Sequence, residues 1–395
     1  MNKSFLSLLV IFISFNCFSM DKTLEKEKEK ADQQIVPFPK AVFNRDIKGL
    51  LKNLISHEKT AIRGAYYQFD LPELAQAWAQ QKIDHKISGG LVVHGNKTTS
   101  AVNALLLQRI PVSACNGRDG YRFSNMHHKF LCLPNTVQGK KLVVTGSFNF
   151  TPAADGKNYE DLVVIEDPAV YQSFEDEYKR LVNNSTLLRR SAKKEEFTDI
   201  PEHQQHHQIN AIPSAYFSPN IRQVLLALIG HEQRSFYGAS YRFNLYDVAQ
   251  AWVKKQQELV AQQGGVKSPT SLLVDGSFAN ETPQALSLLI EAGVPVKELE
   301  KPTGCMHHKF FVFGKNKNDK PLLLTGSFNP TGQADQANWE NIVVTDDLDA
   351  FNAYKKQLLQ LGAASNLIPK EALGYQKKVS SMVANMNNIP EDKRH

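Results

Sequence analysis

The sequence predicts an α/β protein made of two tandem repeats, each a sheet covered by helices on both faces. Motifs of the first half of the chain recur, in the same order, in the second half. Short apolar segments typical of buried strands alternate with amphipathic segments typical of helices. The chain has 395 residues, of which 42% are hydrophobic, so it is long enough to build two such units.

The duplication rests on six short motifs that keep their register. Three recur 174 residues later: His57-Glu58 at His231-Glu232, Gly64–Phe69 at Gly238–Phe243, and Ala77-Trp78 at Ala251-Trp252. Three more recur 180 residues later: Met126–Phe130 at Met306–Phe310, Thr145–Asn149 at Thr325–Asn329, and Asn158–Glu160 at Asn338–Glu340. A net insertion between the two sets explains the change of offset. Segments that repeat in a sequence usually fold into similar structural units, so we expect two similar units in this chain.

The elements of the first repeat follow from its periodicity. In order, the pattern indicates a helix over 44–56, a strand over 62–68, a helix over 71–81, a strand over 91–93, a helix over 101–108, a strand from Pro111, a strand pair over 126–133 and 141–145, a strand over 162–165 and a helix over 169–181. Pro72 suits the first turn of its helix. This alternation predicts helices on both faces of each sheet.

The first 19 residues resemble an export signal. Lys3 precedes the apolar run 5–15, and Cys17 and Ser19 place small residues where a signal peptidase cleaves, which predicts cleavage before Met20. The run is short for a membrane span, so an uncleaved anchor is the alternative. We therefore expect an exported protein, periplasmic or secreted, without stable membrane insertion. The predicted organisation is a signal peptide (1–19), a charged spacer (20–41), repeat 1 (42–188), a polar linker (189–213), repeat 2 (214–365) and a tail (366–395).

Composition adds limited information about partners. A net charge of +6 mildly favours an anionic partner such as nucleic acid or an acidic lipid surface. Removal of the signal leaves three cysteines, an odd number, which excludes a disulfide-stapled scaffold. The histidines of the linker, His203, His206 and His207, favour a solvated segment over a metal site.

The residues that carry chemistry are the ones the repeats keep. In a strand, positions two apart share a face, so His127 and Lys129 point the same way, as do His307 and Lys309. An imidazole, an ammonium group and neutral donors suit a phosphate: the histidine attacks phosphorus or donates a proton, and the others stabilise its oxygens. A single histidine on a strand is usually structural, but packing gives no reason to repeat these polar residues in register. The sequence therefore predicts a phosphate site.

His-x-Lys followed by Gly-Ser-x-Asn, twice in one chain, resembles the phospholipase D superfamily over about 42–361. The Gly-Ser-Phe-Asn and Asn-x-Glu motifs are most similar to those of its nuclease and cardiolipin-hydrolase branch. The resemblance implies two α/β/α sandwich repeats about a pseudo-twofold axis, one shared cleft, a phosphohistidine intermediate, no metal and no other cofactor. It implies His127 as nucleophile and His307 as general acid, although the sequence itself leaves the two roles open. The expected catalytic residues are His127, Lys129, Asn149, Glu160, His307, Lys309, Asn329 and Glu340, with Ser147 and Ser327 binding phosphate.

The chain departs from the family pattern at one position of each repeat. The family motif continues to an aspartate, where this chain has Pro134 and Gly314. Both residues form turns, so we expect the aspartate to have a structural role. The predicted function is hydrolysis of phosphodiester bonds in phospholipid or nucleic acid by a monomer, since both half-sites lie in one chain. The alternatives are an endonuclease acting on single strands, an inactive phosphate-binding module, and phosphatidyl transfer, against which the lack of membrane helices counts.

Overall fold

The computed structural model describes residues 40–95, 98–136, 139–188, 197–198, 200–201, 209, 211–264, 268–279, 283–300 and 303–370. The predicted signal peptide, the three histidines of the linker and the tail from residue 371 lie outside the described residues. The two repeats belong to one compact unit that begins at Lys40.

The first repeat forms an eight-stranded mixed sheet in the order β1-β7-β6-β5-β2-β3-β4-β8. Its strands are β1 (Ala41–Phe43), β2 (Arg63–Tyr66), β3 (Leu91–His94), β4 (Val112–Cys115), β5 (Lys129–Leu133), β6 (Leu142–Gly146), β7 (Asp161–Ile165) and β8 (Thr186–Leu187). Strands β2, β3 and β4 pair in parallel, and the other neighbours pair antiparallel. The carboxyl ends of the parallel strands therefore share one edge with the start of β5.

The second repeat builds an equivalent sheet in the order β16-β12-β11-β10-β13-β14-β15-β9. Its strands are β9 (Ser214–Phe217), β10 (Phe236–Ser240), β11 (Thr270–Asp275), β12 (Val296–Leu299), β13 (Lys309–Phe313), β14 (Leu322–Gly326), β15 (Asn341–Thr345) and β16 (Asn366–Leu367). The central strands of both sheets are buried throughout, as their continuous apolar runs predict.

The helices connect and cover these strands. They are α2 (Asp46–His57), α3 (Pro72–His85), α4 (Ser100–Leu107), α5 (Pro152–Gly156) and α6 (Pro168–Asn183) in repeat 1, and α7 (Ile221–His231), α8 (Tyr246–Gln262), α9 (Gly276–Ala279), α10 (Gln284–Glu291), α11 (Gly332–Gln336) and α12 (Leu348–Ala363) in repeat 2, with a 3-10 turn, η2 (Lys317–Asp319). Asp167 and Asp347 cap the long helices α6 and α12 at equivalent positions. None of the described helices is both long and apolar enough to cross a membrane.

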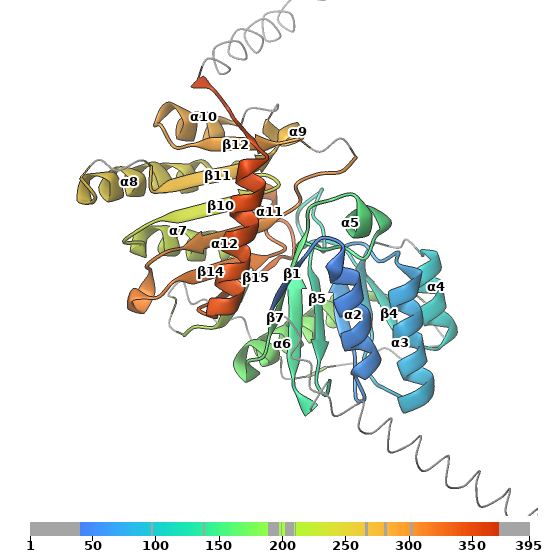
Figure 1. Cartoon of the computed structure of the whole chain (residues 1–395). Coiled ribbons are helices and arrows are strands. Elements are labelled where there is room, and N and C mark those ends of the chain that lie inside the picture. Colours follow the sequence, from blue (N-terminus) through green and yellow to red (C-terminus); the bar gives the residue numbers. More distant parts are fainter. Residues whose placement is uncertain are drawn as a thin grey trace, which may run out of the picture. The chain divides into compact units, whose positions relative to one another are not determined.

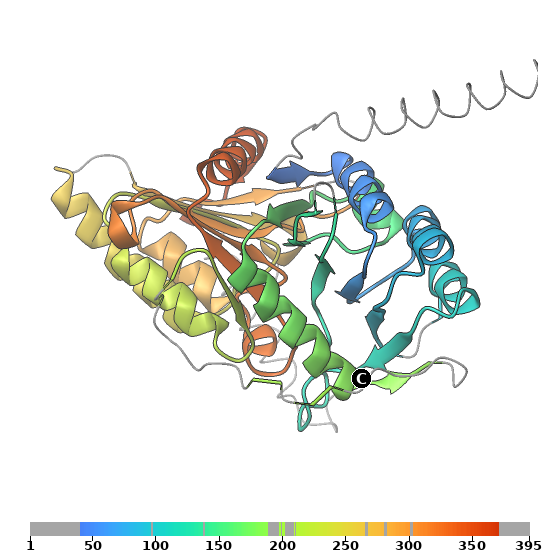
Figure 2. The same ribbon diagram turned by 90° about the horizontal axis from the view of Figure 1, so that it is seen from below.

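Both repeats share a central core. Figures 1 and 2 show α2, α3 and α4 on the outer face of one sheet and α7 and α8 on the outer face of the other. Between the sheets, Phe130 and Phe174 of repeat 1 belong to the same buried cluster as Phe310 and Tyr354 of repeat 2. Helix α6 contacts β9 of the second repeat, and α12 contacts β1 of the first. These reciprocal contacts are those that two repeats related by a twofold axis make.

The predicted α/β architecture of two repeats is confirmed, and its errors are local. The strand expected from Met126 begins only at Lys129. The preceding segment is extended, but its backbone bonds the other repeat: Met126 forms a bridge with Trp339, and His127 N donates to Trp339 O. The short edge strands and the five-residue helices α5 and α11 were not predicted, because their patterns are too short to recognise. Cys115, Cys132 and Cys305 form no disulfide bond within the described part of the chain.

Candidate active site

The two His-x-Lys segments bind the opposite repeat through their backbones. His127 N donates to Trp339 O, and Trp339 N donates to Asn125 O, both at 2.9 Å. At the equivalent place, His307 N donates to Tyr159 O and Tyr159 N donates to Cys305 O, again at 2.9 Å. Each histidine is therefore fixed beside the residue that precedes the glutamate of the other repeat.

Each imidazole is held by that glutamate. His127 Nδ1 lies 2.8 and 2.9 Å from the two carboxylate oxygens of Glu340, and His307 Nδ1 lies 2.9 Å from Glu160 Oε2. Both carboxylates are fully buried, while the imidazoles keep 13% and 12% of their surface exposed. Because a carboxylate accepts the bond, Nδ1 is the donor in each ring and Nε2 is left for chemistry.

The serines that were expected to bind phosphate bind the glutamates instead. Ser147 Oγ donates to Glu160 and Ser327 Oγ to Glu340, each at 2.5 Å, and both serines are fully buried. Each hydroxyl also accepts a backbone N–H, from Asp161 and Asn341. In this structure the serines therefore hold the glutamates, and phosphate binding by Ser147 and Ser327 stays a prediction.

A second donor to each glutamate was missed. Asn158 Nδ2 donates to Glu160 and Asn338 Nδ2 donates to Glu340, each at 2.9 Å. The signal for both was the repeated Asn-x-Glu motif, in which only the glutamate was assigned. Every carboxylate thus accepts bonds from one serine, one asparagine and one histidine. Such outer contacts fix the orientation of a reactive group, here the imidazole.

The two lysines lie deep in the site. Lys129 and Lys309 are 1% exposed, and each Nζ donates at 2.6 Å to the carbonyl of the histidine two residues before it. Burial lowers the pKa of Lys129 to about 7, although the charges of Glu340 and Glu160 oppose the shift. Burial lowers the pKa of Lys309 as well. An anion between the two ammonium groups would restore their charge, so the pair favours an anionic ligand.

The two asparagines of the Gly-Ser-x-Asn motif follow strands β6 and β14, which end at Gly146 and Gly326. A Cβ atom on Gly146 would lie 2.3 Å from Asp161 O, and one on Gly326 would lie 2.2 Å from Asn341 O, so only glycine lets these strands approach their neighbours. Three residues on, the Oδ1 atoms of Asn149 and Asn329 are buried and have no hydrogen-bond partner among the described residues. A buried polar atom without a partner is costly, and an amide oxygen can only accept, so these atoms point to a ligand group that donates, such as water or an alcohol. The Nδ2 groups of the same two side chains are the donors that phosphoryl oxygens would need.

The electrostatic environments of the two halves differ. Burial holds the pKa of His127 well below its usual value, and the charges of Lys129 and Lys309 lower it further. Burial also raises the pKa of its partner Glu340 to about 7. In the other half, burial lowers the pKa of His307 but the charge of Glu160 opposes this. Burial alone would raise the pKa of Glu160, yet His307 and Lys309 outweigh it and leave that pKa below its usual value. The His307 half therefore accommodates charge more readily.

An aromatic ring covers each half-site. The Tyr67 ring contacts His127, and the Tyr241 ring contacts His307, with centroid separations of 4.9 and 5.2 Å. Lys129 Nζ and Lys309 Nζ lie 5.6 and 5.3 Å from the same two rings. The tyrosines were recognised as part of a repeated motif but not as site residues, because strand aromatics are usually core.

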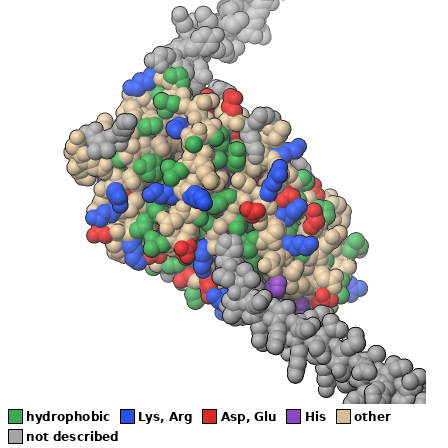
Figure 3. Space-filling model, viewed as in Figure 1, with side chains coloured by type: hydrophobic (Ala, Val, Ile, Leu, Met, Phe, Trp, Pro, Cys, Tyr) green, Lys and Arg blue, Asp and Glu red, His purple; other side chains and the backbone are tan. Residues whose placement is uncertain are grey.

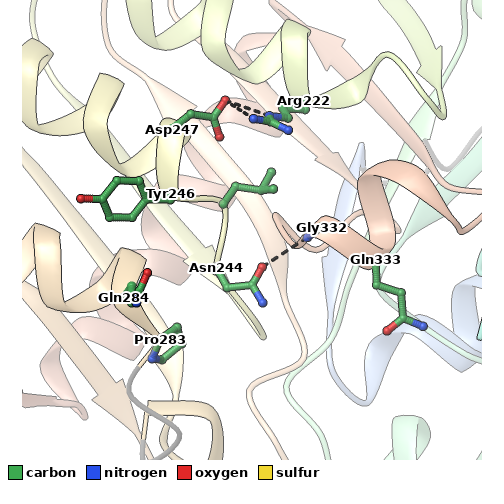
Figure 4. Close-up of a pocket in the computed structure, with 9 residues that line it drawn as sticks. Arg222, Asn244, Tyr246, Asp247, Pro283, Gln284, Gly332 and Gln333 are labelled. Atoms are coloured by element: carbon green, nitrogen blue, oxygen red, sulfur yellow. Dashed lines mark hydrogen bonds and ion pairs between the residues drawn. The ribbon is translucent and has the colours of Figure 1, made fainter. Parts of the chain in front are cut away.

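One cavity lies beside the first half-site, and another lies in repeat 2. One of about 390 Å³ is lined by Tyr67, His94, Asp70 and Thr99 among others. A larger one of about 650 Å³ lies in repeat 2 and is lined by Arg222, Asn244 and Tyr246 among others (Figure 4). In this second cavity Arg222 is paired with Asp247, and Asn244 accepts a bond from Gly332 N. None of the predicted catalytic residues lines either cavity.

The turns that replace the family aspartate lie far from the histidines. Pro134 follows the last residue of β5 and lies five positions after Lys129, about 17 Å of strand. The turn is held by another carboxylate, Glu58, which accepts bonds from the backbone N–H groups of Asn135, Thr60 and Ala61. Glu232 has the same role beside Gly314, where it accepts a bond from Lys315 N. The described residues contain no group of three His, Cys, Asp or Glu side chains placed to hold a metal ion.

Comparison with known proteins agrees with this geometry. A family model described as "Cardiolipin synthase, PLD-like domain" matches residues 51–182 and 225–361, which together are more than half of the chain. The protein belongs to the phospholipase D superfamily. The two matched segments are the two repeats, so the superfamily assignment covers both half-sites.

Individual relatives match a smaller part of this chain than the family model does. The mitochondrial cardiolipin hydrolase of Xenopus tropicalis is 33% identical over 137 residues, 35% of this chain and 59% of that protein. A phospholipase D of Rickettsia conorii is 31% identical over 105 residues, 27% of this chain and 48% of that protein. These matches thus span about half of the relatives' length. The structure of phosphatidylserine synthase from Haemophilus influenzae covers 91% of this chain and 98% of its own, with a TM-score of 0.56 and 15% identity, which shows a shared fold.

Proposed function

We propose that this protein is a phospholipase D-type phosphodiesterase that works through a phosphohistidine. The observation that carries the proposal is the pair of imidazoles, each held at Nδ1 by a buried glutamate of the opposite repeat. This leaves two Nε2 atoms, two lysines and two asparagines for one phosphate. A nucleophile and a proton donor oriented in this way can divide one difficult displacement into two easier steps.

In the first step Nε2 of one histidine attacks phosphorus. The P–N bond forms, the P–O bond to the leaving alcohol breaks, and the second histidine gives that oxygen its Nε2 proton. In the second step the histidine that gave up its proton takes one from water. The water oxygen attacks phosphorus, and the P–N bond to the other histidine breaks. Lys129 and Lys309 neutralise the charge that grows on the phosphoryl oxygens, and Asn149 and Asn329 donate to them.

The difference between the halves supports His127 as the nucleophile. Attack requires a neutral ring, and the burial of His127 and Glu340 together favours one. Departure of the alcohol requires a protonated ring, and the charged Glu160 favours one at His307. Enzymes assign acid and base roles to two groups of the same kind by giving them environments that move their pKa values apart.

The substrate is proposed to be a phosphodiester of phospholipid or nucleic acid. The relatives are named cardiolipin hydrolase and phospholipase D. We further propose that the protein acts after export, outside the cytoplasm, as the N-terminal signal pattern suggests. An endonuclease acting on single strands, a phosphatidyl transferase in which an alcohol replaces water, and an inactive phosphate-binding module are the competing functions.

The test is purified chain from residue 20 onward, in EDTA, incubated with single-stranded DNA, RNA, phosphatidylcholine and cardiolipin. Hydrolysis of one substrate class in EDTA, with an acid-labile phospho-adduct trapped on one histidine, supports the proposal. His127→Ala and His307→Ala should each reduce turnover at least about a hundredfold, whereas His231→Ala, an exposed histidine outside the site, should not. Phosphate binding without hydrolysis of any substrate would favour the inactive module.

A further inference from the structure

The loop that leads to His127 differs from its counterpart in the second repeat. It runs from the end of β4 over residues 116–125, whereas the equivalent connection from β12 to Met306 covers only residues 300–305. The extra length includes Tyr121, Arg122 and Phe123. The duplication therefore kept the site and added an aromatic and basic segment on one side of it.

The added segment exposes two aromatic rings. Phe123 is 74% exposed and Tyr121 is 45% exposed. The guanidinium group of Arg122 lies 5.3 Å from the centre of the Phe123 ring. Scattered single apolar residues are normal on a surface, but two rings and an arginine within three residues make a local patch with a defined chemistry.

The loop is fixed at its base, so the rings are held outward. Arg118 donates from its backbone N to Ala337 O and from Nη1 to Gln336 O, at 3.1 and 2.8 Å. Gln333 Nε2 donates to the carbonyl of Phe123 itself at 2.6 Å. Ser124 Oγ closes the loop by donating to Arg118 O and Tyr121 O. The second repeat thus anchors the loop of the first and keeps Phe123 from folding back.

The exposed rings lie close to the reactive histidine. His127 lies four positions after Phe123, so their Cα atoms are at most about 14 Å apart. His127 is itself fixed by its backbone bond to Trp339. A partner that binds the Tyr121 and Phe123 rings is therefore held at a short, fixed distance from His127.

The charges around the loop distinguish two kinds of partner. A nucleic-acid strand needs a basic track for its phosphates beside the stacking rings. The groove next to the loop, lined by Gln333 and Gly332, contains Arg222, but its guanidinium is paired with Asp247 at 2.6 Å and Asp335 at 3.5 Å (Figure 4). Figure 3 shows one face of the molecule, on which basic and acidic side chains are interspersed. Two rings with one adjacent arginine instead suit the boundary between lipid headgroups and acyl chains.

We propose that the Tyr121–Phe123 segment is a docking element that seats the protein on an anionic phospholipid surface. The rings enter the interface, Arg122 meets the anionic headgroups, and the anchored base holds the site next to the membrane. This deepens the proposed function, because it states how the same site reaches membrane-borne phosphodiesters. Binding itself requires no catalytic step, so the two proposals can fail separately.

The experiment is co-sedimentation with vesicles of phosphatidylcholine alone or mixed with phosphatidylglycerol. The protein is the chain from residue 20, which retains the whole compact unit from Lys40. The inactive His127→Ala variant, the double variant Tyr121→Ser/Phe123→Ser and Arg122→Glu are compared. Leu359→Ser is the matched control, since Leu359 is 65% exposed on α12.

We expect His127→Ala and Leu359→Ser to bind anionic vesicles as the parent does, and both loop variants to bind at least about tenfold more weakly. Hydrolysis of a soluble chromogenic diester should be unchanged in the loop variants. The proposal is overturned if the parent does not bind anionic vesicles, or if the loop variants bind them normally. Loss of binding to single-stranded DNA with unchanged vesicle binding would also overturn it, and would identify the rings as a stacking surface for bases.

Discussion

Asp161 and Asn341 occupy equivalent positions of the two repeats, and each accepts a hydrogen bond from a histidine of the opposite repeat. His308 Nδ1 lies 2.7 Å from Asp161 Oδ1, and His128 Nδ1 lies 2.9 Å from Asn341 Oδ1. All four residues are fully buried. The histidines that face away from the reactive cleft thus join the two repeats directly behind it.

The partners of these two histidines are exchanged. At the other ring nitrogen, His128 contacts the carboxylate of Glu177 at 2.9 Å, while His308 contacts the amide of Gln357 at 3.5 Å. Each ring therefore meets one carboxylate and one amide, but at opposite ends. Tyr354 completes the pattern: its hydroxyl donates to Asp161, whereas the equivalent residue of the first repeat is Phe174. We interpret the exchange as a compensated arrangement that keeps one carboxylate per histidine.

This arrangement predicts rescue by a partner exchange. Asp161→Asn removes the carboxylate of His308 and should lower the free energy of unfolding by about 1–3 kcal/mol. Adding Gln357→Glu and Tyr354→Phe rebuilds the chemistry of the first repeat around His308 and should recover most of that loss. Urea unfolding followed by circular dichroism measures both. If the triple variant is as unstable as the sum of its single changes, the exchange is not compensatory.

How much of the site the sequence could predict depends on whether a contact lies within one repeat. His127, Lys129, Asn149 and Glu160 were recognised because each recurs in register, and repetition is visible without any structure. The partner of each histidine was not recognisable, because Glu160 binds His307 and no spacing within a repeat encodes a contact to the other repeat. The edge strands, two to four residues long, carry too short a pattern to predict.

The serines show a different limit. Ser147 and Ser327 have the chemistry that phosphate binding needs, and a motif gives residue types without directions. The hydroxyls point to Glu160 and Glu340 because β6 and β14 pass directly beside β7 and β15, an approach that only Gly146 and Gly326 permit. Orientation inside a buried network follows from packing, which the sequence pattern does not contain.

The crossed His–Glu pairs predict energetic coupling between the repeats. A double-mutant cycle of His127→Ala with Glu340→Gln should give an interaction of about 0.5–3 kcal/mol in the free energy of unfolding. The cycle of His127→Ala with Glu160→Gln should give a much smaller one, since no bond joins that pair. Coupling confined to residues of the same repeat would contradict the crossed geometry.

The lowered pKa values predict an acidic optimum for activity. The nucleophile must be neutral, and the pKa of His127 is below its usual value, so kcat/KM should rise with pH along a limb that lies below about 6.5. His307 must be protonated to release the alcohol, and its pKa is also below its usual value, so kcat/KM should fall as pH rises through the pKa of His307. Lys129 must be charged to bind phosphate, so a further fall should follow as pH rises through its pKa of about 7. The profile should be a narrow bell on the acid side of neutrality, with limbs that belong to the coupled groups.

Lys129→Arg provides the check on the alkaline limb. An arginine stays charged at all accessible pH values, so the variant should keep the acid limb and the fall that belongs to His307, and should lose only the further fall near pH 7 that Lys129 causes, whatever its absolute rate. Measurement of kcat/KM against pH for the parent and this variant decides the point. An unchanged alkaline limb would assign the fall to another group.

The missing family aspartate leads to the last prediction. Pro134 lies about 17 Å of strand away from Lys129, and the turn there is already held by Glu58 through three backbone N–H groups. Restoring the acid with Pro134→Asp should therefore change turnover by less than about threefold. Glu58→Gln should instead lower the free energy of unfolding by about 1–3 kcal/mol, because a fully buried carboxylate with several bonds is replaced by a weaker acceptor. Its turnover below the unfolding transition should stay near that of the parent. A rise in turnover of several orders of magnitude in Pro134→Asp would show that the aspartate acts in catalysis and that this chain has lost most of its activity.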